Sequence, residues 1–156
     1  IFVDREELDL TQVDTIFDFV CSHTPDIVIN CAAYTNVEGA EDQPQEAEII
    51  NAHAPRELAH ACAHIDIPLV HISTDFVFGD MPATPITEQA AKAPKNVYGL
   101  SKSNGEDAII ENCPKHIIVR TSSVFGRFGA NFVKTMLGVI PVISSPQLKY
   151  RVCQRE

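Results

Sequence analysis

The residues with the most specific chemistry in this sequence are Tyr98 and Lys102, four positions apart. If the segment is helical, both side chains point the same way. An ammonium beside a phenol lowers the phenol's pKa, because the positive charge favours the phenolate. Such a tyrosine can donate a proton to a carbonyl near neutral pH. Thr74, which follows an apolar run, offers a hydroxyl to the same oxygen. Together the three groups meet the needs of carbonyl reduction by hydride.

The tyrosine–lysine spacing alone has a plain alternative, a surface turn leading into a helix, because short motifs recur by chance. The neighbouring segments favour the chemical interpretation. Thr74 follows the strand-like run 68–73, and Tyr98 opens a helix after a polar loop that contains proline. A further apolar run, 117–119, follows that helix.

Seven segments of the sequence carry a resemblance to a known family. They are residues 8–11, 25–35, 51–52, 73–75, 96–102, 120–122 and 131–137. In these segments the chain resembles the extended short-chain dehydrogenase/reductase family, and more closely the dTDP-4-dehydrorhamnose reductase family within it. The matches follow the family's order and cover nearly everything from Leu8 to Leu137. The resemblance implies a Rossmann-like fold.

The resemblance also implies roles for the three chemical groups. Tyr98 is the expected proton donor. Lys102 is expected to lower its pKa and to hydrogen-bond the nicotinamide ribose. Thr74 is expected to bind the C4 carbonyl oxygen of the sugar. NADPH, with NADH as the alternative, would deliver hydride to C4 and convert dTDP-4-dehydro-L-rhamnose into dTDP-L-rhamnose.

Other positions match the family's cofactor contacts. These are Asp9, Leu10, Ala32, Ala33 and Tyr34, besides Tyr98 and Lys102. A helix-entry turn is the plain alternative for the first two, and ordinary packing is the alternative for the two alanines. Asn51 is expected to fix a helix against the Tyr98 region, or else to be an ordinary polar helix residue.

The expected substrate contacts are Thr74, Asp75, Phe76, Ser123 and Asn131. Two of them depart from the family pattern. Phe76 replaces a tyrosine and lacks its hydroxyl, and Ser123 replaces a tryptophan. Losing a large aromatic removes a wall of the sugar pocket.

Two other functions remain open at this stage. One is a non-catalytic module like the regulatory subunit of methionine adenosyltransferase, which belongs to the same superfamily. The other is an epimerase or dehydratase that acts on another nucleotide sugar. Retention of Thr74, Tyr98 and Lys102 argues against the first alternative, and product analysis separates the second from the reductase.

The composition of the sequence disfavours some classes of binding partner. The 156 residues carry a net charge of −9 without a cluster of basic residues, which disfavours nucleic acid and anionic membranes. No apolar run reaches the ~18 residues of a spanning helix. Five cysteines, an odd number, are interpreted as buried thiols in a reducing cytoplasm. His60 and His64 are four residues apart but have no third ligand nearby, so no metal is expected.

The hydrophobic pattern predicts an α/β domain with a parallel sheet and helices on both faces. Expected strands are the end of one at 1–3, then 27–31, 69–73 and 116–121; expected helices are 11–23, 44–64, 98–112 and 131–140; the segment 74–94 is expected to be a long loop. Thr11 is expected to cap the first helix with Asp14 as a partner. The strand 27–31 is expected to be covered on both faces. Ligands of such sheets lie beyond the carboxyl ends of the strands, where Ala32, Thr74 and 121–123 are expected to converge.

A glycine-rich phosphate loop is not found in this sequence. Gly126 and Gly129 come late and follow the wrong strand. Residues 1–140 are therefore interpreted as a partial NAD(P)-binding domain, and 141–156 as a divergent tail. We expect a fold that is incomplete at both ends, exposed strand edges that favour a homodimer, and little or no activity of the chain alone.

Overall fold

The computed structural model describes residues 1–79, 85–129 and 131–139. The chain forms two compact units, Ile1–Ser122 and Ser123–Glu156. The predicted tail, 141–156, lies outside the described residues.

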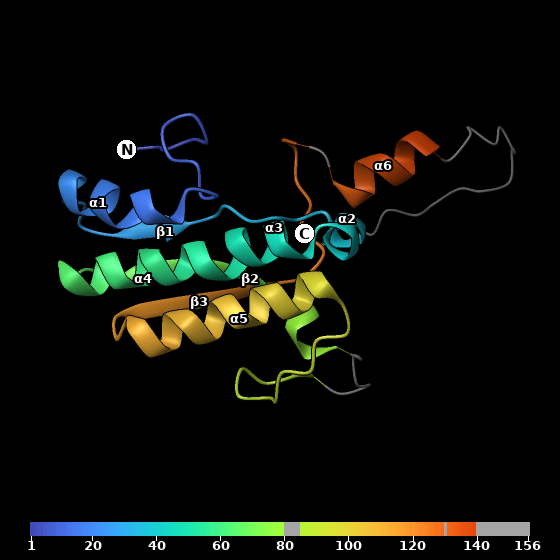
Figure 1. The fold of residues 1–156 in the computed structure, drawn as a ribbon. Helices are drawn as coiled ribbons and strands as arrows, with labels where there is room; N and C mark the ends of the chain where they lie inside the picture. Colours follow the sequence, from blue (N-terminus) through green and yellow to red (C-terminus); the bar gives the residue numbers. More distant parts are fainter. Residues whose placement is uncertain (80–84, 130, 140–156) are drawn as a thin grey trace, which may run out of the picture. The chain divides into compact units, whose positions relative to one another are not determined.

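Three parallel strands form the sheet of the first unit: β1 (Val28–Asn30), β2 (Leu69–Thr74) and β3 (His116–Thr121). Their order across the sheet is β1-β2-β3 (Figure 1). In register, Asn30 lies opposite His71, and Thr74 lies opposite Thr121. The prediction of a Rossmann-like parallel sheet is confirmed, and the carboxyl ends of β2 and β3 meet at one edge.

Helices connect these strands. They are α1 (Val13–His23), α2 (Val37–Asp42), α3 (Pro44–Glu48), the π-helical turn η1 (Ile49–His53), α4 (Ala54–His64), the 3-10 turn η2 (Asp75–Phe78), α5 (Val97–Asn112) and, in the second unit, α6 (Phe132–Val139). The single helix predicted over 44–64 is thus α3, η1 and α4 in succession. The turn η2 lies in the segment predicted as a long loop, and α2 lies where no helix was predicted. Isolated π-helical turns of this kind often occur at functional sites.

The hydrophobic core lies between one face of the sheet and helices α1, α4 and α5. Its buried residues include Ile16 and Val20 of α1, Leu58 and Cys62 of α4, Leu69 of β2 and Ile109 of α5, with Val28 and Ile118 packed against them. Figure 1 shows the three helices running along the strands. The apolar side chains of these helices pack against every second residue of the strands, and this packing holds α5 on the sheet.

The opposite face of the sheet is exposed in the described residues. Ile29 of β1 is 59% exposed and Ile117 of β3 is 58% exposed. These positions alternate with the buried ones, as strand geometry requires. The expectation that strand 27–31 is covered on both faces is therefore wrong within the described part of the chain, and the described helices of the first unit that contribute to the core lie on one face.

Two local predictions near the N-terminus are also wrong. Residues 1–3 form no strand and are exposed. Helix α1 begins at Val13 after Gln12, without a side-chain cap. Asp9 displaces Thr11 from the capping role, because its Oδ1 accepts hydrogen bonds from the Thr11 amide at 2.9 Å and hydroxyl at 2.8 Å.

Helix α5 approaches η1 so closely that a Cβ on Gly105 would overlap the carbonyl oxygen of Asn51. We expect Gly105→Ala to lower the free energy of unfolding by about 2 kcal/mol, since overpacking against backbone outweighs the helix propensity of alanine. Gly138→Ala is the matched control, because a Cβ at this α6 position meets nothing within 4 Å. Urea unfolding of both variants checks this, and equal effects would contradict it.

Candidate active site

Tyr98 lies in the first turn of α5, where Asn96 starts the helix. Asn96 has an extended backbone, and its side-chain Oδ1 accepts a hydrogen bond from the Gly99 amide at 2.7 Å. This is the usual geometry of an asparagine N-cap. The Tyr98 ring meets the Phe76 ring edge-on, with centroids 5.5 Å apart. The cap and the aromatic contact together fix the tyrosine beside the turn that follows β2.

Thr74 is the last residue of β2 and is only 7% exposed. Its hydroxyl donates to Asp75 Oδ1 at 3.1 Å and accepts from the Phe76 amide at 3.2 Å, so it caps η2. The Thr74 hydroxyl also lies near enough to the Tyr98 phenol to lower the pKa of the tyrosine. The structure therefore brings together the threonine and the tyrosine that the sequence suggested as partners.

The pKa of Tyr98 lies above its ordinary value, mainly because burial disfavours the phenolate. The nearby Thr74 hydroxyl lowers this pKa and the charge of Asp75 raises it. The predicted lowering by Lys102 is wrong in this conformation. The lysine Nζ is held by groups on β2, so its charge is not directed at the phenol.

Lys102 lies one turn after Tyr98, and both side chains face β2, as the four-residue spacing predicts. The lysine is 1% exposed. Its Nζ donates to the Ile72 carbonyl at 2.8 Å and lies 3.0 Å from His71 Nε2. Burial lowers the pKa of Lys102 to about 8, against an opposing effect of Glu106.

Glu106, one further turn along α5, is fully buried. Arg120 of β3 binds it with two hydrogen bonds, at 2.9 and 2.7 Å, and the Ser73 hydroxyl of β2 donates to it at 2.6 Å. Lys92 Nζ lies 3.5 Å from its Oε2. Burial raises the pKa of Glu106, but these hydrogen bonds and cations outweigh that effect, and the resulting pKa is below the ordinary value. This carboxylate joins α5 to both neighbouring strands.

Asn51 of η1 is fully buried and ties the segment after β1 to α5. Its Oδ1 accepts from the Tyr34 amide at 2.9 Å, and its Nδ2 donates to the Tyr34 carbonyl at 3.1 Å and to Ser101 Oγ at 3.0 Å. Ser101 lies between Tyr98 and Lys102 on α5. The predicted role of Asn51 in fixing a helix against the Tyr98 region is confirmed.

Comparison with known proteins agrees with this geometry. A family model described as RmlD substrate binding domain matches residues 1–147. This chain belongs to the RmlD substrate binding domain family. The resemblance inferred from the seven sequence segments is thereby confirmed.

Several curated relatives of this chain carry the name dTDP-4-dehydrorhamnose reductase. One from Mycolicibacterium smegmatis is 45% identical over 132 residues, which are 83% of this chain and 40% of the relative. One from Sinorhizobium fredii is 41% identical over 133 residues, which are 85% of this chain and 45% of the relative. The chain thus spans less than half the length of these relatives.

Solved structures of similar proteins have the same fold. A dTDP-4-dehydrorhamnose reductase from Clostridium acetobutylicum matches with a TM-score of 0.84 and 41% identity, over 88% of this chain and 49% of that one. A dTDP-4-dehydrorhamnose reductase from Bacillus anthracis, in complex with NADP, matches with a TM-score of 0.82 and 41% identity, over 87% of this chain and 49% of that one.

The residues expected to contact the cofactor differ from one another in their burial and contacts. Ala32 is exposed and Ala33 is half-buried, just past the carboxyl end of β1. Leu10 packs against the hydrophobic core shortly before α1, and its contact with a cofactor stays a prediction. Asp9 is held by Thr11, as described above, and its Oδ2 lies 3.5 Å from Arg5 Nε. The hydrogen bonds from Thr11 are the main reason that the pKa of Asp9 is lowered.

Ser123 and Asn131 belong to the second unit, and their contacts with substrate stay predictions. Ser123 has a left-handed backbone with φ of 48°. Asn131 accepts from the Lys134 amide at 3.2 Å and donates to the Gly126 carbonyl at 3.0 Å. Within its own unit Asn131 therefore holds the start of α6 and the preceding loop together.

Three buried polar residues at this site were not singled out from the sequence: Asn30, His71 and Glu106. The signals were present. Glu106 continues the four-residue spacing of Tyr98 and Lys102 along one helix face. Asn30 and His71 interrupt otherwise apolar strands, and a buried polar group needs a partner.

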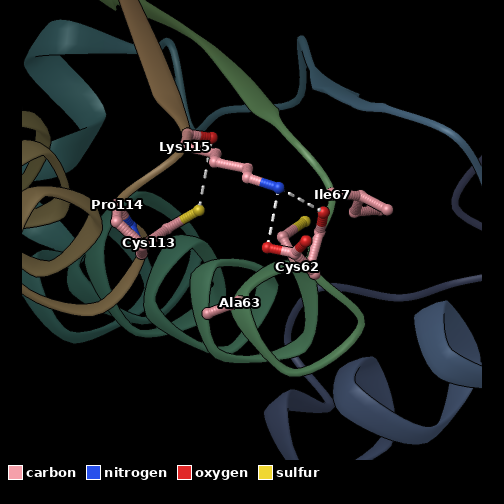
Figure 2. A pocket seen from close by; sticks show the side chains of 7 residues that line it. Cys62, Ala63, Ile67, Cys113, Pro114 and Lys115 are labelled. Carbon is pink, nitrogen blue, oxygen red and sulfur yellow. Dashed lines mark hydrogen bonds and ion pairs between the residues drawn. The ribbon is translucent and has the colours of Figure 1, made fainter.

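A small hollow lies near the amino ends of β2 and β3, at the opposite end of the strands from Thr74. Figure 2 shows Cys62, Cys113 and Lys115 around it. Lys115 Nζ pairs with Asp66 Oδ1 at 2.7 Å. The hollow has a volume of about 10 Å³, which is enough for one water molecule and far too small for a nucleotide.

Two classes of site are not found in the described part of the chain. No cluster of three or more histidine, cysteine or acidic side chains is arranged to hold a metal ion there. Across the same residues, no helix combines the length and the apolar character needed to cross a membrane. His60, one member of the histidine pair, contacts Asn112 Oδ1 at 2.9 Å and Glu57 Oε2 at 3.4 Å.

Removing the charge of Glu106 tests the anchoring of α5. We expect Glu106→Gln to lower the free energy of unfolding at pH 7 by about 3 kcal/mol, because Arg120 and Lys92 lose their buried partner. Glu111→Gln, at an exposed position of the same helix, should change it little.

The difference between wild type and Glu106→Gln also depends on pH. The folded-state pKa of Glu106 is depressed, so its stabilisation is complete above the ordinary pKa of 4.5 and is lost as the pH falls through the folded value. Urea unfolding from pH 7 to pH 3 should show the difference shrinking. A constant difference would contradict the assignment of a charged, paired Glu106.

Proposed function

We propose that this chain provides the catalytic residues of an NADPH-dependent reductase that converts dTDP-4-dehydro-L-rhamnose into dTDP-L-rhamnose. The observation that carries the proposal is the close placement of the Thr74 hydroxyl and the Tyr98 phenol at the carboxyl end of β2, with Lys102 one turn further along α5. The names of the curated relatives and the NADP complex of the Bacillus anthracis protein support it.

The residues of the first unit fit the nicotinamide end of such a cofactor. Ala32 and Ala33 follow β1, and their small side chains leave the backbone open to a flat ligand. Tyr98 and Lys102 come from the helix facing the neighbouring strand, β2. Parallel sheets bind nucleotides at this edge. When bound, the dinucleotide supplies the hydride.

Tyr98 supplies the proton. Because burial keeps its pKa above the ordinary value, the phenol is protonated at neutral pH and can donate to the carbonyl oxygen as C4 becomes reduced. The Thr74 hydroxyl, which donates to Asp75 in this structure, can turn to the same oxygen. A charged Lys102 near the phenol would then stabilise the phenolate until solvent reprotonates it.

The proposal includes a cytoplasmic location and a homodimer. Cys21, Cys31, Cys62 and Cys113 are free thiols, which is usual for proteins of reducing compartments. Cys62 and Cys113 are buried as expected, but Cys31 is exposed, so the expected burial is wrong for that residue. The exposed apolar side chains Ile29 and Ile117 on one sheet face support association with another protein surface, for which a second copy is our proposal.

We expect these residues, within a protein of the relatives' full length, to reduce dTDP-4-dehydro-L-rhamnose with NADPH. Tyr98→Phe should lower kcat by about 10²- to 10⁴-fold with little change in NADPH affinity, because it removes the proton donor alone. Lys102→Met should weaken NADPH binding as well, whereas Lys115→Met, at the opposite end of the strands, should change neither. NADPH oxidation and product chromatography measure these effects.

Two results would contradict the proposed function. Full activity of Tyr98→Phe would remove the tyrosine from the reaction. A different product from another nucleotide sugar, with no turnover of dTDP-4-dehydro-L-rhamnose by the folded protein, would favour the epimerase or dehydratase alternative.

A further inference from the structure

Asn30 and His71 are two buried polar residues that lie opposite each other on β1 and β2. His71 is fully buried and Asn30 is 5% exposed. His71 Nδ1 lies 3.1 Å from Asn30 Nδ2, and its Nε2 lies 3.0 Å from Lys102 Nζ. The imidazole therefore bridges the strand that leads to Ala32 and the helix that carries the lysine.

The backbone determines the direction of these hydrogen bonds. The Ala32 amide can only donate, and it donates to Asn30 Oδ1 at 3.0 Å. The Asn30 Nδ2 then faces His71 Nδ1 as a donor, so Nδ1 must accept. Burial, with the nearby Lys102 and against the effect of Glu106, lowers the pKa of His71 to about 3. The imidazole is neutral at pH 7, and its one proton is on Nε2.

The proton on Nε2 decides the state of Lys102. An ammonium has three donors and no acceptor, so it would face Nε2–H donor to donor. A neutral amine has a lone pair that accepts from Nε2–H, while one of its own hydrogens is donated to the Ile72 carbonyl at 2.8 Å. If the lysine were charged, the series of hydrogen bonds from Ala32 through Asn30, His71 and Lys102 to Ile72 would contain one contact between two donors.

We propose that His71 is a positioning residue that holds Lys102 against β2 as a neutral amine, and that Lys102 takes up a proton from solvent when it leaves His71 to bind the cofactor ribose beside Tyr98. The first part stands on the hydrogen-bond chain alone. The second part rests on the proposed function.

The charged groups around Lys102 are accounted for in this arrangement. Glu106 on α5 favours the ammonium, but Arg120 on β3 and Lys92 before α5 already neutralise its charge. Tyr98, the remaining titratable group on this face of α5, is neutral. Burial also lowers the pKa of Lys102, and this acts in the same direction as the donor–donor conflict with His71.

The wild-type chain provides the first test. Two-bond ¹H–¹⁵N NMR spectra of the histidine rings distinguish the two neutral tautomers from the imidazolium. We expect His71 to be an Nε2–H neutral ring from pH 6 to pH 9, assigned by its loss in His71→Phe. An Nδ1–H ring or an imidazolium would overturn the proposal, and this measurement needs neither cofactor nor activity.

Asn30→Asp should reverse the direction of the hydrogen bonds that His71 makes. A carboxylate accepts from both the Ala32 amide and His71 Nδ1, so the ring proton moves to Nδ1, and Nε2 becomes an acceptor for an ammonium. We expect the tautomer to switch and the titration of the Lys102 ¹³Cε signal to move to higher pH. Asn36→Asp is the matched control, since Asn36 uses only its Oδ1, as the cap of Gly39. Equal shifts in both variants, or none in either, would overturn the proposal.

The pH dependence of NADPH affinity tests the second part. Wild-type affinity should fall by up to about tenfold per pH unit over the range in which Lys102 is neutral in the free protein and charged in the complex, because binding takes up one proton, and Asn30→Asp should be flatter. Bound NADPH with a flat wild-type profile would overturn the proton uptake. Absence of NADPH binding at every pH would overturn the proposed function, and the tautomer of His71 would still decide the role of the histidine.

Discussion

Burying Lys102 and Glu106 on one face of α5 is the constraint on which the rest of the site depends. Both side chains are shielded from water, and a buried charge or polar group without partners costs several kcal/mol. Strands β2 and β3 supply those partners: the Ile72 carbonyl and His71 for the lysine, and Ser73 and Arg120 for the glutamate. The helix can satisfy both only in one position along the strands.

That position determines where Tyr98 lies. One turn before Lys102, the ring reaches the end of β2, where Thr74 caps η2 and Phe76 closes one side. The cap at Asn96 stops the helix at this point. Asn51 adds a connection from η1 through Ser101. The reacting side chains are thus few, while the contacts that place them extend over both strands and two helices.

The sequence was informative where the relevant physics is local or periodic. The apolar runs identified β2 and β3, and the boundaries of α5 were correct within one residue because Asn96 is a strong cap. The tyrosine–lysine spacing correctly predicted a shared helix face. It did not predict the target of the lysine, because that depends on His71, a residue from another element. The lowered pKa expected for Tyr98 is wrong because burial raises it and Lys102 binds groups on β2 instead.

Other features depend on contacts that no local pattern encodes. The π-helical turn accompanies a side chain, Asn51, with partners 17 and 50 residues away. Exposure of Ile29 and Ile117 reflects which elements cover the sheet, which strand hydrophobicity alone does not reveal.

The most direct measurement is the nuclear Overhauser effect between the Tyr98 ring and the Thr74 methyl group in wild type, Glu106→Gln and Glu111→Gln. We predict cross-peaks in wild type and Glu111→Gln that weaken in Glu106→Gln; no contact in wild type, or equal intensities in all three proteins, would contradict the anchoring of the site by buried polar partners.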